Sequence, residues 1–170
     1  DLLENCINNN EDGYGLVVKE VGKDLRVIKK CPKDGTRLKE IQKLLDDNID
    51  HLRYLHLRHR TEGVINLQNC HPFTVYDENG IQIEFMHNGT MYEYAPQKEV
   101  KVNGVIESYA DPRSDTKIFC DRVLIPMFKE IKNADYTKEF ANKALGKMWP
   151  VSSNRGLLIS NKYPTLILSP

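Results

Sequence analysis

The sequence has no long apolar segment, no secretion signal and no excess of either charge. Its apolar runs fall well short of the roughly 20 residues that a membrane-spanning helix needs. No basic-then-apolar leader opens the chain. Acidic and basic residues number 24 each, which argues against a general nucleic-acid-binding protein because such proteins present a strongly basic surface. The locally basic segment 51–60 is weak evidence for a polyanionic partner, so we expect neither a membrane nor a nucleic-acid partner.

Cysteines and histidines are few and scattered. The cysteines are Cys6, Cys31, Cys70 and Cys120. They show no CxxC spacing and no disulfide framework, so free thiols in a reducing cytoplasm are expected. Four of the histidines are candidate metal ligands: His56, His59, His71 and His87. Their spacing matches no compact ligand pattern, so we expect no metal and no other cofactor.

The length and the pattern of the first third suit one folded domain over residues 1–170. A chain of 170 residues with 40% hydrophobic and 28% charged residues is long enough for a substantial core. Apolar β-rich runs at 14–20 and 24–29 flank a turn at Gly22-Lys23, which predicts a hairpin. Apolar residues at helical spacing predict a helix over 36–48 with Thr36 as its N-cap, and 52–57 is expected to be a strand.

The remainder alternates strands, tight turns and two helices. Asn-Gly pairs are strong signals for hairpin turns, and they occur at Asn79-Gly80, Asn88-Gly89 and Asn103-Gly104. They predict strands over 73–76, 81–86, 90–94 and 99–102. Helices are expected over 115–131, with a kink at Pro126, and over 136–148. Two last strands are expected over 156–160 and 165–168. Strands and helices in separate runs indicate an α+β fold with antiparallel sheets.

Five short segments, taken in order, resemble the motifs of class II glutamine amidotransferases. They are NNNEDGYG at 8–15, HLRHRTEG at 56–63, NCHPF at 69–73, FMHNGT at 85–90 and SDT at 114–116. Each segment alone is weak evidence, but five in the family's order are a strong signal. The resemblance covers about residues 8–120, and the last 50 residues match only loosely. It implies the four-layer αββα sandwich of the N-terminal-nucleophile hydrolases.

The resemblance also implies a reaction and a set of site residues. The family hydrolyses the side-chain amide of glutamine and releases ammonia for transfer to an acceptor. Arg58 is expected to bind the α-carboxylate of glutamine and Asp115 its α-ammonium group. Asn88 and Gly89 are expected to bind the oxyanion, with Thr61 and His87 completing the substrate-binding set. The acceptor would belong to a synthase partner or an acceptor-binding subunit.

Each of these residues also has a purely local interpretation. Charged residues are usually solvated, so Arg58 could be a surface arginine beside a strand. Asp115 could be part of a helix N-cap. An Asn-Gly pair such as Asn88-Gly89 is most often a hairpin turn. The order of the motifs is what favours the functional interpretation.

The expected nucleophile does not occur among residues 1–170. In this family a cysteine at the mature N-terminus attacks the amide, and its own α-amine accepts the proton, because a terminal amine titrates near ~7.7–8.0. Cys6 lies too close to the first motif and is expected to be structural. We expect the nucleophile on an N-terminal segment upstream of Asp1.

Two alternatives remain open. The chain could be an inactive binding or interaction module on the same scaffold, because a fold does not fix a function. A cysteine hydrolase could instead pair Cys70 with His56 or His87, although neighbouring positions in sequence do not establish that geometry.

Overall fold

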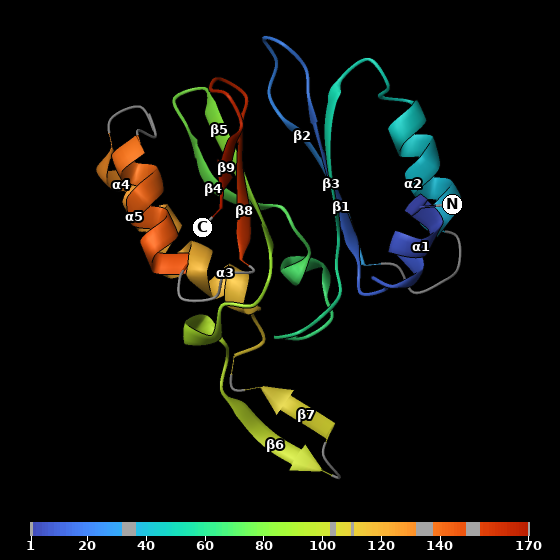
Figure 1. Ribbon diagram of the computed structural model, residues 1–170, viewed down its shortest axis with the longest axis vertical. Helices are drawn as coiled ribbons and strands as arrows, with labels where there is room; N and C mark the ends of the chain where they lie inside the picture. Colours follow the sequence, from blue (N-terminus) through green and yellow to red (C-terminus); the bar gives the residue numbers. More distant parts are fainter. Residues whose placement is uncertain are drawn as a thin grey trace.

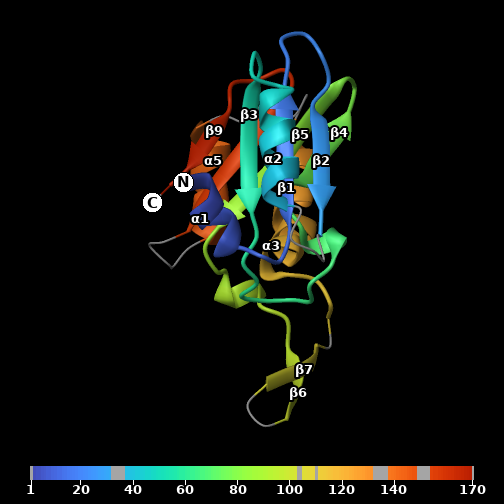
Figure 2. The ribbon, with the colours of Figure 1, turned by 90° about the vertical axis from the view of Figure 1, so that its right-hand side faces the viewer.

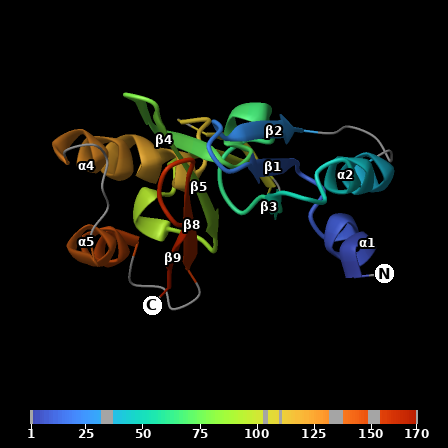
Figure 3. The same cartoon turned by 90° about the horizontal axis from the view of Figure 1, so that it is seen from above.

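Two antiparallel sheets stacked face to face form the middle of the structure (Figure 1). The structure is a computed structural model that describes residues 2–31, 37–102, 105–109, 111–131, 138–148 and 154–169. Helices cover the outer face of each sheet. Seen from above, the order is α4 and α5, one sheet, the second sheet, then α1 and α2 (Figure 3). This arrangement confirms the α+β fold and the four-layer αββα sandwich.

The first sheet has the strand order β2-β1-β3. The strands are β1 (Tyr14–Lys19), β2 (Arg26–Lys30) and β3 (Leu52–Leu57). The central strand β1 is buried along almost its whole length, as an apolar run between two layers should be. The turn between β1 and β2 contains Gly22 at a positive φ of 75°, a conformation that glycine adopts without strain.

The second sheet has the order β4-β5-β8-β9. Its strands are β4 (Phe73–Glu78), β5 (Ile81–Asn88), β8 (Arg155–Ser160) and β9 (Leu166–Leu168). Asn79 and Gly80, both at positive φ, join β4 to β5 as predicted. The longest strand, β5, lies in the middle of the sheet and ends at Asn88, so it extends the chain into the region of the expected site.

The outer helices pack mainly through apolar side chains. Helices α1 (Leu2–Asn8) and α2 (Arg37–Asp46) cover the first sheet, and α4 (Ile125–Glu130) and α5 (Lys138–Met148) cover the second. The largest buried cluster includes Phe85, Phe119 and Phe128 and lies between the second sheet and its helices. None of the helices in the described segments is long and apolar enough to cross a membrane.

Three sequence predictions need correction. The short helix α1 was not predicted, because only Ile7 is fully buried and seven residues give a weak periodic signal. Residues 90–94 do not form the predicted strand, since Tyr92–Tyr94 is a single 3₁₀ turn, η2. The second Asn-Gly pair, Asn88-Gly89, is therefore no hairpin turn. Predictions that involve Thr36, the pair Asn103-Gly104 and residues 136–137 lie outside the described residues.

The predicted long helix over 115–131 is divided into three parts. It comprises α3 (Asp115–Phe119), the π-helical turn η3 (Cys120–Leu124) and α4. Pro126 lies at the start of α4 and has no N–H to donate to a carbonyl one turn earlier. A wider turn just before the proline accommodates that missing donor.

A two-stranded arm projects from one end of the sandwich (Figure 2). It consists of β6 (Lys98–Val102) and β7 (Val105–Tyr109), paired antiparallel. Strand β7 was not predicted. The arm is inserted between η2 and α3, so both of its ends lead directly to the residues around Asp115.

Candidate active site

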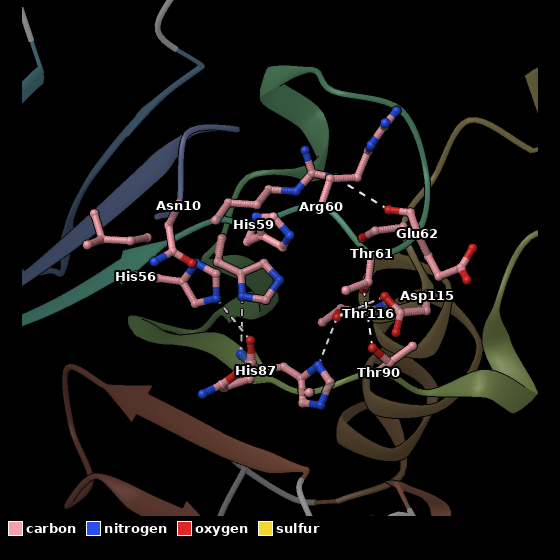
Figure 4. A pocket seen from close by; sticks show the side chains of 16 residues that line it. Asn10, His56, His59, Arg60, Thr61, Glu62, His87, Thr90, Asp115 and Thr116 are labelled. Atoms are coloured by element: carbon pink, nitrogen blue, oxygen red, sulfur yellow. Dashed lines mark hydrogen bonds between the residues drawn. The ribbon is translucent and has the colours of Figure 1, made fainter. Parts of the chain in front are cut away.

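One small cavity brings together all six residues that the sequence predicts for the site. It has a volume of about 220 Å³ and lies where β3 and β5 end and α3 begins (Figure 4). The predicted residues among its lining are Arg58, Thr61, His87, Asn88, Gly89 and Asp115. The loop after β3, the end of β5 and the first turn of α3 therefore form a single site.

Arg58 is held in this cavity by its own backbone. Its N–H donates to the Gly13 carbonyl at 2.8 Å, and its carbonyl accepts from the Asp12 N–H at 3.0 Å. The side chain is only 5% exposed, and Nη2 makes long hydrogen bonds of 3.3–3.4 Å to the carbonyls of Glu62 and Val64. Among the described residues, Nη1 has no hydrogen-bond partner. A buried guanidinium with a spare donor can accept a carboxylate from a ligand.

Asn69 ties the loop after Arg58 to the start of α3. It ends the 3₁₀ turn η1 (Leu67–Asn69), and its Oδ1 accepts from the Ser114 N–H at 2.8 Å. Its Nδ2 donates to the carbonyls of Val64 and Pro112. Gly63 has no room for a side chain here, because a Cβ would lie 2.7 Å from the Ser114 nitrogen. The NCHPF motif marked Asn69, but only the structure shows these bonds.

Asp115 presents a buried carboxylate to the same cavity. Ser114, and not Asp115, caps α3, because its hydroxyl accepts from the Lys117 N–H. The Asp115 carboxylate accepts from the backbone N–H groups of Met91 at 2.6 Å and Thr116 at 2.8 Å. Burial raises the pKa of Asp115, and these donors oppose that rise. The carboxylate is thus fixed in place beside a ligand-sized space.

Asn88 and Gly89 end β5 at the floor of the cavity. The Asn88 side chain is exposed, whereas Gly89 is packed tightly at φ 127°. A Cβ on Gly89 would lie 2.2 Å from Oδ1 of Asn154. Only glycine fits at this point, so its N–H can approach a ligand without a side chain in the way.

Three histidines that also line the cavity, His56, His71 and His87, form a neutral layer. The rings of His56 and His71 pack against each other with centroids 3.9 Å apart and planes tilted by 38°. His56 Nε2 donates to the His87 carbonyl at 2.9 Å, and the His87 N–H donates to His71 Nδ1 at 3.2 Å. Burial lowers the pKa of His56 and of His87 to about 4, and that of His71 well below its usual value. In the part of the chain that the structure describes, no group of three or more His, Cys, Asp or Glu side chains is arranged to hold a metal ion.

Threonines complete the rim of the cavity. Thr61 is exposed and accepts a hydrogen bond from the Thr90 hydroxyl at 3.3 Å. Figure 4 shows both residues beside Asp115 and Thr116, with Asn10 and His56 on the other side of the cavity. Thr61 therefore lies where a ligand would enter.

None of the four cysteines lines this cavity. Cys70 is fully buried, and its thiol faces backbone carbonyls, among them those of Lys30 and Asn66. Burial raises the pKa of Cys70 to about 11. Its thiol is therefore poorly suited to form the thiolate that a Cys-His hydrolase requires.

An adjoining groove lies beside the open edge of β3. It has a volume of about 530 Å³ and shares Asn10, His56, His87 and Asn88 with the first cavity. Its other lining residues are mostly apolar: Cys6, Leu55, Leu57, Met86, Arg155, Leu157 and Ile167. Within the described residues, β3 pairs only with β1, so its other side is free to accept a strand.

The αββα sandwich and the cavity around Arg58 and Asp115 agree with the family resemblance of the sequence. A comparison with known families matches residues 3–158 to the glutamine amidotransferases class-II, and the chain belongs to that family. It is also similar to the probable glutamine amidotransferase DUG3 of Saccharomyces cerevisiae, with 27% identity over 104 residues. That match covers 59% of this chain and 28% of the yeast protein.

Proposed function

We propose that this chain is a glutamine amidotransferase domain that hydrolyses the glutamine side-chain amide and releases ammonia. The observation that carries the proposal is the pairing of two buried, opposite charges on one small cavity. Arg58 has a spare donor for an α-carboxylate, and Asp115 has a fixed carboxylate for an α-ammonium group. A zwitterionic amino acid complements both charges at once.

Asn88 and Gly89 are proposed to stabilise the transition state. A thiolate attacks the amide carbon, a C–S bond forms, and the carbonyl oxygen becomes an oxyanion. The Asn88 side-chain amide and the Gly89 N–H would donate to that oxygen. The C–N bond then breaks, the nitrogen takes up a proton and leaves as ammonia, and water hydrolyses the thioester to glutamate.

The proposal places the attacking cysteine outside the 170 residues of this sequence. The groove beside β3 supports this placement, because it offers an open strand edge and apolar walls next to Asn88. A segment bound there would bring an N-terminal thiol close to the oxyanion residues. The α-amine of such a cysteine would act as the general base.

A decisive test uses the native protein. Intact mass and N-terminal sequencing would identify the mature first residue, and an ammonia assay would measure glutamine hydrolysis. We expect a mature N-terminal cysteine and glutamine-dependent ammonia release. A mature terminus at Asp1 with no release of ammonia would refute the proposed activity.

The released ammonia needs an acceptor. We propose that a synthase partner or an acceptor-binding subunit uses it. All four cysteines are free thiols, which fits the cytoplasmic location expected from the sequence.

One observation favours a second candidate function, a glutamine-binding module without catalysis. None of the cysteines of residues 1–170 lines the cavity that contains Arg58 and Asp115. Calorimetry with glutamine distinguishes the two functions. Binding that produces no glutamate or ammonia in the native protein would support the module.

A further inference from the structure

Asn154 lies directly beneath the Asn88-Gly89 dipeptide, at a position that no sequence motif marks. It precedes β8 and is 3% exposed. Its Nδ2 donates to the Met148 carbonyl at 2.9 Å, and its Oδ1 lies 3.1 Å from Nε2 of His87. The side chain therefore links the end of α5 to the strand that carries Asn88.

These bonds fix the protonation of His87. The Met148 carbonyl can only accept, so the amide nitrogen of Asn154 faces it and the amide oxygen faces His87. Nε2 of His87 must then carry the ring proton. Burial keeps this ring neutral, with a pKa of about 4. Nδ1 is thus an acceptor, and it receives the Thr116 hydroxyl proton at 3.0 Å.

The same Asn154 side chain also confines Gly89. Its Oδ1 lies only 2.2 Å from the position that a Cβ on Gly89 would take, so no side chain fits there. Asn154 thus lies close against Gly89, and the same oxygen accepts a hydrogen bond from His87, two residues earlier in the chain. On the other side of the His87 ring, Nδ1 contacts Thr116, the residue after Asp115 in α3.

We propose that Asn154 is a positioning residue that fixes the oxyanion-binding dipeptide relative to the first turn of α3. The line of contacts runs from Asn154 through His87 to Thr116, and it keeps the Gly89 N–H aimed into the cavity. The proposal rests on the proposed glutamine hydrolysis. Asn154 does not line the cavity, so it acts through His87 and Gly89 and not on the substrate itself.

The charged and titratable groups around His87 come from three other elements. His56 on β3 donates to its carbonyl, and His71 before β4 accepts from its N–H. Asp115 on α3 adjoins its partner Thr116, and Arg58 acts on both neighbouring histidines at longer range. Asn154 is the neighbour whose hydrogen bond raises the pKa of His87 against the effect of burial.

The substitution Asn154→Asp tests this arrangement because it changes the charge and hardly changes the shape. A carboxylate beside Nε2–H stabilises the imidazolium, so the pKa of His87 should rise into the range of the assay. Nδ1 then carries a proton and can no longer accept from Thr116. We expect kcat for ammonia release to fall by up to about 100-fold, as for a small displacement of a reacting group. KM for glutamine should change little, because Arg58 and Asp115 remain.

Asn161→Asp is the matched control. Asn161 follows the other end of β8, and its side chain also bonds to neighbouring backbone, at Gln82 and Gly80. Asn161 lies outside the cavity lining. This control should retain the wild-type kcat and the wild-type His87 titration.

Nuclear magnetic resonance of the imidazole nitrogens supplies a readout that is independent of activity. In the wild-type protein, His87 should be the neutral Nε2–H tautomer from about pH 5.5 upward, since its pKa is about 4. The opposite tautomer would overturn the proposal, even if the Asn154→Asp variant does not fold. An unchanged kcat and an unchanged His87 titration in Asn154→Asp would overturn it as well. A wild-type protein without glutaminase activity would instead refute the proposed function. The tautomer measurement would then still test the hydrogen bonds from Asn154 through His87 to Thr116.

Discussion

At the scale of single residues, two buried charges dominate the site. Arg58 and Asp115 are 5% and 4% exposed. Burying an unpaired charge is expensive, and a chain without a ligand for these groups would gain stability by replacing them with apolar residues. Backbone groups already form hydrogen bonds with each side chain: two carbonyls accept from Arg58, and two N–H groups donate to Asp115. Both residues belong to the lining of the cavity, where a zwitterion would complement their charges.

The first prediction concerns the shape of the guanidinium. Arg58→Lys retains the positive charge but loses the planar pair of donors that binds a carboxylate. We expect kcat/KM for glutamine to fall about 10- to 100-fold, since hydrogen bonds to charged groups contribute ~1.5–3 kcal/mol. Most of the loss should appear in KM. Steady-state ammonia release measures it, and Arg53→Lys on the exposed face of β3 should retain wild-type values. Equal kinetics for both variants would contradict the role of Arg58.

A second prediction separates the oxyanion residue from the binding residues. Asn88→Ala removes one donor to the developing negative charge and should lower kcat about 100- to 1000-fold. KM should stay near the wild-type value, because neither charged group is changed. Asn79→Gly, in the β4–β5 turn at φ 55°, is the control and should retain kcat. A raised KM with normal kcat for Asn88→Ala would assign this residue to ground-state binding.

The sequence motifs marked six residues that line this site and one residue that holds it, Asn69, but they missed Asn154. Arg58, Asn88 and Asp115 could be marked from the sequence because each lies in a short contiguous motif. Asn154 belongs to no motif, since its hydrogen bonds reach His87 across 67 positions of the chain. Such long-range partners depend on how the layers pack, and local patterns carry no signal for them.

At the scale of elements, local turn chemistry predicted some junctions and failed at others. Asn79-Gly80 forms the predicted hairpin because β4 and β5 pair on both sides of it. At Asn88-Gly89 the same dipeptide has no returning strand. The Met91 N–H donates to Asp115 instead of to a neighbouring strand. A tertiary partner for the backbone therefore overrides the local preference for a hairpin.

The third prediction uses two glycines in different elements. Gly15 is the second residue of β1, and a Cβ there would sit 1.7 Å from the backbone oxygen of His71. Because backbone atoms cannot move away cheaply, Gly15→Ala should lower the free energy of unfolding by more than ~2 kcal/mol, in the range of overpacked cores. Gly146→Ala in α5 meets nothing within 4 Å and should stabilise the helix by about 0.5–1 kcal/mol. Urea unfolding measures both, and a stable Gly15→Ala variant would contradict the close approach of β1 to the loop before β4.

At the scale of the whole molecule, the two sheets have different widths. The sheet with α1 and α2 has three strands, and the opposite sheet has four. Ile167 on β9 remains 67% exposed, and the groove beside β3 opens at the same place. The sequence pattern alone indicated α+β with hairpins. The layer order came from the family resemblance, because periodicity shows which face of an element is apolar and not which element covers it.

The neutral histidine layer links the stability of the whole fold to pH. His56 and His87 have a pKa of about 4 in the folded protein, against ~6.5 for an unfolded chain. Between these values the unfolded state binds more protons, so stability decreases as the pH falls from about 6.5 toward 4. Burial raises the pKa of Glu84 and Asp115. These two carboxyl groups act in the opposite direction, because the folded state then binds more protons than the unfolded state above their usual pKa.

The fourth prediction therefore compares how steeply the free energy of unfolding changes with pH, and not its absolute value. Each buried histidine contributes up to about 1.4 kcal/mol per pH unit to the decline between pH 6.5 and 4. His56→Gln keeps a donor for the His87 carbonyl but cannot titrate, so its free energy of unfolding should fall less steeply with acid than that of the wild-type protein. Urea unfolding at several pH values measures the slope. His59 is exposed, and His59→Gln is the matched control because it removes an imidazole that lies outside the layer. If His56→Gln and His59→Gln gave the same dependence of unfolding free energy on pH, the histidine layer would not be the source of acid sensitivity. The neutral state of His87, on which its proposed hydrogen bonds to Asn154 and Thr116 depend, would then lose its support.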